Sequence, residues 1–359
     1  MSKRLIWKLL LAAPLSFTMS ASAFAQDAAS EAAAPETLAT PPAKEKSVLG
    51  ADCCSGDCLE DTCCDRDWIW LAGTEAAFLS CNPHNSSTSV TASSGAGTTS
   101  GGGGGGYDGM TYAPRVWLGV EGDCWGLLGR FFYLSDYSDS SAPFLGNGSI
   151  LTDQLRVYTT DLEFTRKGHY NCTKLDASFG VRYASLDSSG SATALSTDIQ
   201  TLGAAAAYSA SSFNGTGITG GLQGRTPINC CSNLHYFWNV RGSVIWGSSS
   251  ASAITAAAAS DNPANANSVN AAFAASDSES LWIGEIQVGL QWEHQLTCIP
   301  ANAFFRVAAE YQNWNADNGS GAFATSLALT PGAGGAATAQ AGDIELDLVG
   351  LTIGTGFTW

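Results

Sequence analysis

Charged side chains recur at alternate positions along segments that are otherwise apolar or small. In the segment 175–183, Phe179 and Val181 fall on one face of an extended chain, and Asp176 and Arg182 fall on the other. Alternate residues of a β-strand point to opposite faces, so these charges are predicted to share one face. The full set is Glu75, Arg115, Arg130, Asp161, Glu163, Asp176, Arg182, Arg225, Arg241, Glu285, Arg306 and Glu310. Such a face can form a packed network of ion pairs or line a narrow water-filled path, and both interpretations remain open.

The 11 cysteines are the second group able to do chemistry. Exported proteins use cysteine mainly for disulfides. Ten of them lie in a compact N-terminal cluster or beside predicted short turns: Cys53, Cys54, Cys58, Cys63, Cys64, Cys124, Cys172, Cys230, Cys231 and Cys298. We predict that they attach the N-terminal segment to the turns or link neighbouring molecules into a disulfide-bonded homo-oligomer. Zinc is disfavoured because the cluster lacks paired C-x-x-C elements, and no metal site is predicted.

The histidines and the glycine run form no catalytic pattern. Three of the four histidines, His169, His235 and His294, lie at predicted short turns, and only His84 lies on a long connection. The six glycines of 101–106 lack the strand and helix that flank a phosphate-binding loop. We therefore predict no enzyme, no catalytic residue and no cofactor.

The N-terminus predicts export. Lys3, Arg4 and Lys8 precede a short apolar stretch, and Ala23 and Ala25 provide the small residues of a cleavage site, so residues 1–25 are interpreted as a signal peptide. Without those three basic residues the net charge is 13 − 32 = −19. This acidity argues against nucleic acid as a partner. Residues 26–66 are predicted to be a periplasmic Ala/Pro-rich linker followed by the cysteine cluster.

The elements that position these groups are strands. The last one is clearest, because Val349, Leu351, Ile353 and Phe357 alternate with glycine and threonine up to Trp359. About ten such segments follow one another in 67–359, each long enough to cross a bilayer at ~9–11 residues. The predicted fold is all-β: a closed antiparallel transmembrane β-barrel of about ten strands. Twelve is an open alternative, because residues 193–211 could extend a strand or form another hairpin.

Long and short connections alternate along the chain, which is typical of outer-membrane barrels with short periplasmic turns and long extracellular loops. The long ones are predicted to be flexible loops and cover 82–110, 137–152, 188–212, 250–277 and 316–341. Aromatic residues fall near both strand ends, as membrane interfaces require. Outer-membrane lipid is thus a predicted partner. The terminal Trp359 resembles the signal read by the barrel assembly machinery, the second predicted partner.

Several stretches resemble the Legionella-type major outer-membrane, pore-forming protein family. They are Trp68 to Glu75, Leu175 to Arg182, Gly215 to Gly221 and Gly350 to Gly354, and the likeness spans roughly 67–359. The resemblance implies a passive pore and a cysteine-linked envelope. The predicted function is accordingly a narrow diffusion pore for small solutes in the outer membrane. The alternative is a non-conducting structural envelope protein that is cross-linked through periplasmic disulfides.

Overall fold

The computed structural model describes most of the chain from Trp68 onward. The described residues are 68–84, 87–94, 97–104, 109–122, 124–141, 147–170, 172–197, 202–229, 232–260, 267–296, 301–329 and 334–359. The predicted signal peptide, linker and N-terminal cysteine cluster lie outside them. None of the described residues belongs to a helix long and apolar enough to cross a membrane.

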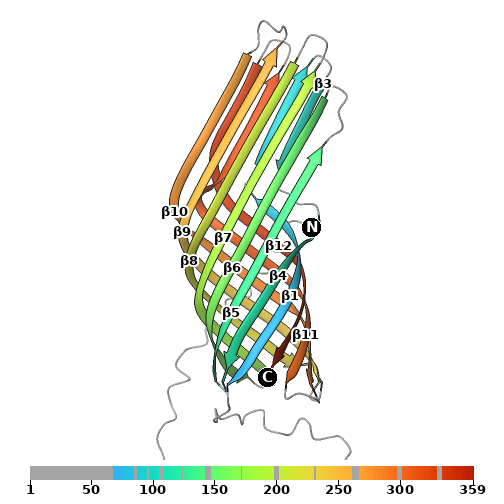
Figure 1. Ribbon diagram of the computed structural model, residues 1–359, viewed down its shortest axis with the longest axis vertical. Coiled ribbons are helices and arrows are strands. Elements are labelled where there is room, and N and C mark those ends of the chain that lie inside the picture. The colour runs from blue at the N-terminus through green and yellow to red at the C-terminus, as the bar shows by residue number, and fades with distance from the viewer. Residues whose placement is uncertain are drawn as a thin grey trace, which may run out of the picture. The chain divides into compact units, whose positions relative to one another are not determined.

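All regular elements in the described residues are strands (Figure 1). Their bounds are β1 Ile69–His84, β2 Ser87–Ser94, β3 Gly97–Gly104, β4 Thr111–Glu121, β5 Trp125–Ser141, β6 Asn147–Tyr170, β7 Thr173–Thr197, β8 Leu202–Pro227, β9 Leu234–Ser260, β10 Asn267–Gln295, β11 Asn302–Leu329 and β12 Gly334–Thr358. Ten of them form an antiparallel ring in the order β10-β9-β8-β7-β6-β5-β4-β1-β12-β11, in which β10 also pairs with β11. The all-β class and the ten-stranded antiparallel sheet are thus confirmed.

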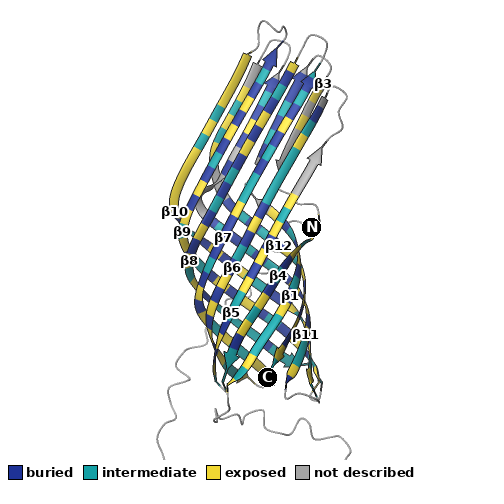
Figure 2. Cartoon of the chain, viewed as in Figure 1, coloured by how far each residue is buried: buried dark blue, intermediate teal, exposed yellow. Residues whose placement is uncertain are grey.

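Side chains alternate between the inside and the outside of the ring, as the sequence pattern predicts (Figure 2). On β12, Leu351 and Ile353 are exposed, whereas Thr352 between them is fully buried. On β6 and β7, Phe164 and Phe179 are 65% and 62% exposed. Because large apolar side chains rarely cluster in water, the outer surface of the ring needs an apolar environment.

The prediction of flexible long loops is wrong for most of their length. The β7–β8 pairing runs without a break from Lys174↔Arg225 to Thr197↔Leu202 and includes almost all of 188–212. Residues 193–197 and 202–211 therefore extend the two strands and do not form a further hairpin. Their Ala, Ser and Gly side chains signal no strand individually, but backbone hydrogen bonds to a neighbouring strand do not depend on side-chain type.

The extended strand ends form a two-layered β-sandwich, which we call the head (Figure 1). One layer continues β5 to β10; the other contains β12, β11 and the hairpin β2–β3, with β2 pairing parallel to β11 through Ala324↔Thr88. Across the layers β11 packs on β8 and β9, and β2 packs on β7 and β8. Thus the extra pair that makes twelve strands comes from 87–104, and Gly101 to Gly104 belong to β3.

Small side chains fill the space between the two layers of the head. The buried cluster there is Val90, Ala92, Ala192, Ala194, Ala205, Ala207, Ala251, Ala253, Ala257, Ala322, Ala324 and Ala328. Alanine brings the two sheets close together with little apolar area per residue, so the stability of the head depends mainly on its strand pairing. This composition explains why the sequence pattern resembles loops.

Candidate functional site in the ring interior

All 12 charged residues predicted to share a face lie inside the ring. Eight of them are buried, with exposures of 7% or less: Glu75, Arg115, Asp161, Glu163, Arg182, Arg241, Arg306 and Glu310. The other four, Arg130, Asp176, Arg225 and Glu285, are partly buried. The alternation therefore identified the interior charges, and their distances reveal three ion-pair groups.

The first ion-pair group joins three strands through Arg115 of β4. Its guanidinium lies 2.7 Å from the Glu75 carboxylate on β1 and 2.6 Å from the Glu310 carboxylate on β11. Arg306 approaches Glu75 at 3.4 Å, and the Gln287 amide of β10 donates to Glu310 at 3.0 Å. Each carboxylate is therefore held by several charged or polar donors.

The second ion-pair group centres on Asp161 of β6. Arg182 makes a bidentate pair with Asp161 at 2.7 and 2.9 Å and also binds Glu285. Arg241 reaches Asp161 at 3.0 Å and binds Glu163 as well. Arg130 of β5 lies 3.6 Å from Glu163 and completes the group. Its members come from β5, β6, β7, β9 and β10, so this group links strands along about half of the ring.

The third ion-pair group lies nearer the short turns and is more exposed. Arg225 binds Asp176 at 2.6 Å and Glu293 at 3.3 Å. His235 lies 3.8 Å from Glu293, and the Gln291 amide donates to Glu293 at 2.9 Å. Glu293 is a partner that the predicted set of interior charges does not contain.

The charges of the three groups nearly cancel, because the predicted set holds six arginines and six carboxylates and Glu293 adds one further carboxylate. Pairs of opposite charge in a desolvated interior are stable only when each partner is matched and hydrogen-bonded. A channel lining that favours one sign of ion would instead leave an excess of charge on the wall. The balance therefore favours a structural network over a selectivity device.

Aromatic rings pack beside the first ion-pair group. The Arg306 guanidinium lies 4.2 Å from the ring centre of Phe237 and 5.4 Å from that of Trp117. Trp117 stacks on Phe304, with ring centres 6.3 Å apart. Trp117 also crosses Gly73, its direct partner on β1, where any side chain would collide with the indole. These aromatic contacts fill space that would otherwise be open.

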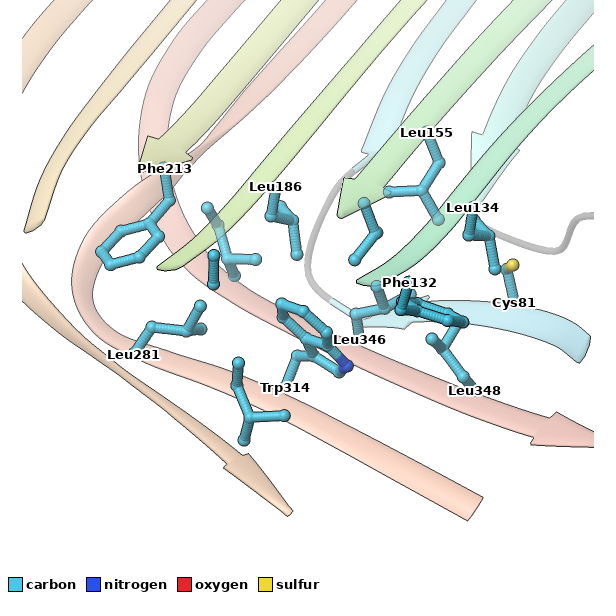
Figure 3. Packing of buried hydrophobic residues seen from close by; sticks show 14 of the residues in the cluster. Cys81, Phe132, Leu134, Leu155, Leu186, Phe213, Leu281, Trp314, Leu346 and Leu348 are labelled. Atoms are coloured by element: carbon cyan, nitrogen blue, oxygen red, sulfur yellow. The ribbon is translucent and has the colours of Figure 1, made fainter. Parts of the chain in front are cut away.

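An apolar layer lies next to the ion pairs, toward the head (Figure 3). All ten strands of the ring contribute to it: Ala77, Leu79, Cys81, Ala113, Phe132, Leu134, Leu155, Val157, Ala184, Leu186, Phe213, Ile245, Leu281, Ile283, Trp314, Ala316, Ile344, Leu346 and Leu348. Figure 3 shows Trp314 and Leu346 pointing into the middle of the cluster. The layer therefore packs across the interior and is not confined to one wall.

The sequence analysis missed this apolar layer because it assigned apolar residues to the outside. A signal was present in the strand register. Trp314 lies four residues after Glu310 and therefore points to the same face of the strand. Phe132 and Leu134 likewise point to the same face as Arg130. Extending the charged face toward the loop end of each strand would have identified these residues.

A small cavity separates the charged and apolar layers at one point. It measures about 10 Å³ and is bordered by Arg115, Arg182, Glu285 and Trp314. This volume is no larger than one water molecule requires. A larger cavity of about 230 Å³ is lined by Arg156, Asp187 and several serines. It belongs to the sheet surface near the base of the head, outside this packed interior.

The described cysteines differ in state. Cys124, at the turn before β5, is disulfide-bonded, whereas Cys81 has a free thiol that is buried in the apolar layer. Of the other nine cysteines only Cys172 is among the described residues, so the predicted pairing stays a prediction. Within the described part of the chain, no group of three or more His, Cys, Asp or Glu side chains is arranged to hold a metal ion.

Cys81 should resist alkylation in the folded protein. The side chain is fully buried among apolar residues, so a water-soluble reagent cannot reach the sulfur, and the surroundings disfavour the reactive thiolate. We expect iodoacetamide at pH 8 to leave Cys81 unmodified until the protein is unfolded, as peptide mass spectrometry can measure. A cysteine introduced by S278C, at an exposed position of β10, should react at once. Equal labelling of both sites in folded protein would contradict the buried position.

Comparisons with known proteins leave the family open. No family model matches this chain, and no curated protein matches it. Outer membrane protease OmpT from Escherichia coli has a similar structure, with a TM-score of 0.38, 10% identity, and coverage of 81% of this chain and 97% of OmpT. For the toluene transporter TodX from Pseudomonas putida the TM-score is 0.29 and the identity 7%, with 82% and 90% coverage. These likenesses are too distant to assign an activity.

Proposed function

We propose that the chain is an outer-membrane β-barrel whose lumen is closed, and that it serves as a structural component of the envelope. The outer surface of the ring supports the membrane location. It carries exposed apolar residues, among them Leu118, Val181, Val240 and Val288. A ring of this kind leaves no free strand edge in the bilayer and satisfies its backbone hydrogen bonds internally.

Exposed aromatic residues mark both boundaries of the apolar band. Trp68, Trp125 and Trp292 are exposed near the short turns, and Trp246 and Trp282 are exposed near the head. Aromatic belts at the two interfaces are typical of transmembrane barrels. We infer that the short turns are periplasmic and that the head projects from the outer surface. Export through residues 1–25 and assembly through Trp359 accord with this orientation.

The apolar layer carries the proposal of a closed lumen. Apolar side chains from all ten strands meet in the middle of the barrel, and the balanced ion pairs fill the space next to them. A barrel of eight strands is already narrow enough for side chains to fill it, whereas wide aqueous pores have about 16–18 strands. Ten strands whose interior is packed in this way form a plug.

Single-channel recording tests this proposal against the predicted diffusion pore. The refolded protein is inserted into a planar bilayer in molar KCl. It is expected to show no conductance at membrane potentials up to about 150 mV of either sign. The double variant F132G/W314G removes two rings from the apolar layer and should produce measurable, fluctuating conductance. Steady open channels in the unmodified protein would contradict a closed lumen and support the narrow pore that the resemblance implies.

A further inference from the structure

The upper half of β10 is a free strand edge. β10 pairs with β9 over its whole described length, but its pairing with β11 begins only at Leu281↔Ala316. Among the described residues, the backbone from Asn267 to Ser280 pairs with a neighbour on one side only. Every residue from Asn267 to Ser278 is at least partly exposed, and Figure 2 shows this strand as the exposed margin of the head.

This edge has few of the features by which proteins protect strand edges. It contains no Lys, no Pro and no bulge, its pairing with β9 is regular from Asn267 to Trp292, and its charged residues are the exposed Asp277 and the buried Glu279 at its lower end. An unprotected long edge presents a row of unsatisfied N–H and C=O groups that can add a further strand. The described part of the head has several free edges. The edge of β10 is the longest of those whose strand pairs without interruption with its neighbour on the opposite side.

The charge of the head restricts which strand can be added. Among its described residues Asp153, Asp187 and Asp277 are acidic, and Arg156, which faces Asp187 in the β6–β7 pairing, is basic, so acidic side chains are in excess. Asp277 is exposed and belongs to the free edge itself. The same layer has a second free edge in β5, which begins where the pairing of β5 with β4 ends at Phe132. This edge is also acidic, because it contains Asp136 and Asp139. A second copy of this chain would therefore bring carboxylates against carboxylates.

We propose that the free edge Asn267–Ser280 binds an extended, basic polypeptide segment by β-strand addition. Main-chain hydrogen bonds would provide the affinity, and Lys or Arg side chains opposite Asp277 would provide the preference. The inference concerns the head and does not depend on whether the lumen conducts. If the barrel conducts ions, the inference about the head is unaffected. If the barrel does not conduct, the inference gains no support from that result.

The test uses the full chain in a neutral detergent and two fluorescent eight-residue peptides. One alternates Lys with Val and Thr, and the other carries Glu in place of each Lys. Fluorescence anisotropy should show binding of the Lys peptide and at least about tenfold weaker binding of the Glu peptide. The D277K variant should lower affinity for the Lys peptide and raise it for the Glu peptide. Equal affinities for both peptides would overturn the charge preference.

Two proline variants test the edge itself. Successive residues of a strand direct their N–H groups to opposite sides, so one of A274P and A275P removes a donor from the free edge and the other removes one from the β9 ladder. The variant that removes the donor of the free edge is identified by its unfolding midpoint, which should equal that of the unmodified protein. This variant should lose peptide binding. Retained binding in that variant would overturn the proposal. So would sedimentation showing that the unmodified protein pairs with itself through this edge.

Discussion

The R241A variant should be strongly destabilised. Arg241 is the shared partner of Asp161 and Glu163, and all three side chains are almost fully buried. Removing one partner from a buried ion pair leaves an uncompensated charge and typically costs ~3–5 kcal/mol. We expect a loss of this size in the free energy of unfolding, measured by urea titration of the protein refolded in lipid vesicles, with tryptophan fluorescence as the readout.

Two further variants separate charge from packing. Arg166 lies on the outward face of β6, where it is exposed and stacks over Trp125 at 5.2 Å, so R166A should cost no more than ~1 kcal/mol. The double variant R241M/E163Q restores the charge balance of the second ion-pair group and should recover a large part of the lost stability. If R241A and R166A lower the unfolding free energy equally, the interior network contributes nothing beyond an exposed arginine.

The W314A variant tests the apolar layer. Trp314 is 1% exposed, and its indole N–H donates to the Gln312 side chain at 3.0 Å. Replacing a buried tryptophan by alanine leaves a cavity and costs ~3–5 kcal/mol. The midpoint of urea unfolding should fall accordingly.

Trp282 provides a matched control for Trp314. It precedes Ile283, the direct partner of Trp314 in the β10–β11 pairing, but it points outward and is 57% exposed. W282A should therefore lower stability much less in detergent, where no bilayer interface orders the ring. A larger effect for W282A than for W314A would mean that the interior is not packed as described.

The alternation of residue types determined the ring part of the fold. In β12, apolar residues at every second position from Val349 to Phe357 can be accommodated only by a strand with one apolar and one polar face. The same rule placed Glu75, Arg115 and Asp161 on the inner surface before any contact was known. It succeeds because the period of a strand does not depend on which strand lies beside it.

Only the tertiary structure revealed the head and the plug. The Ala/Ser/Gly stretches of β7, β8 and β9 have no apolar alternation, and they become strands because a partner of equal length lies beside each of them. Likewise, the register places Leu134 and Trp314 on the charged face, but only closure of the ring brings them together with Leu155 into one packed layer. The sequence by itself therefore determined which residues share a face. Whether the faces enclose a passage or a packed interior depended on distances between strands, which no single strand encodes.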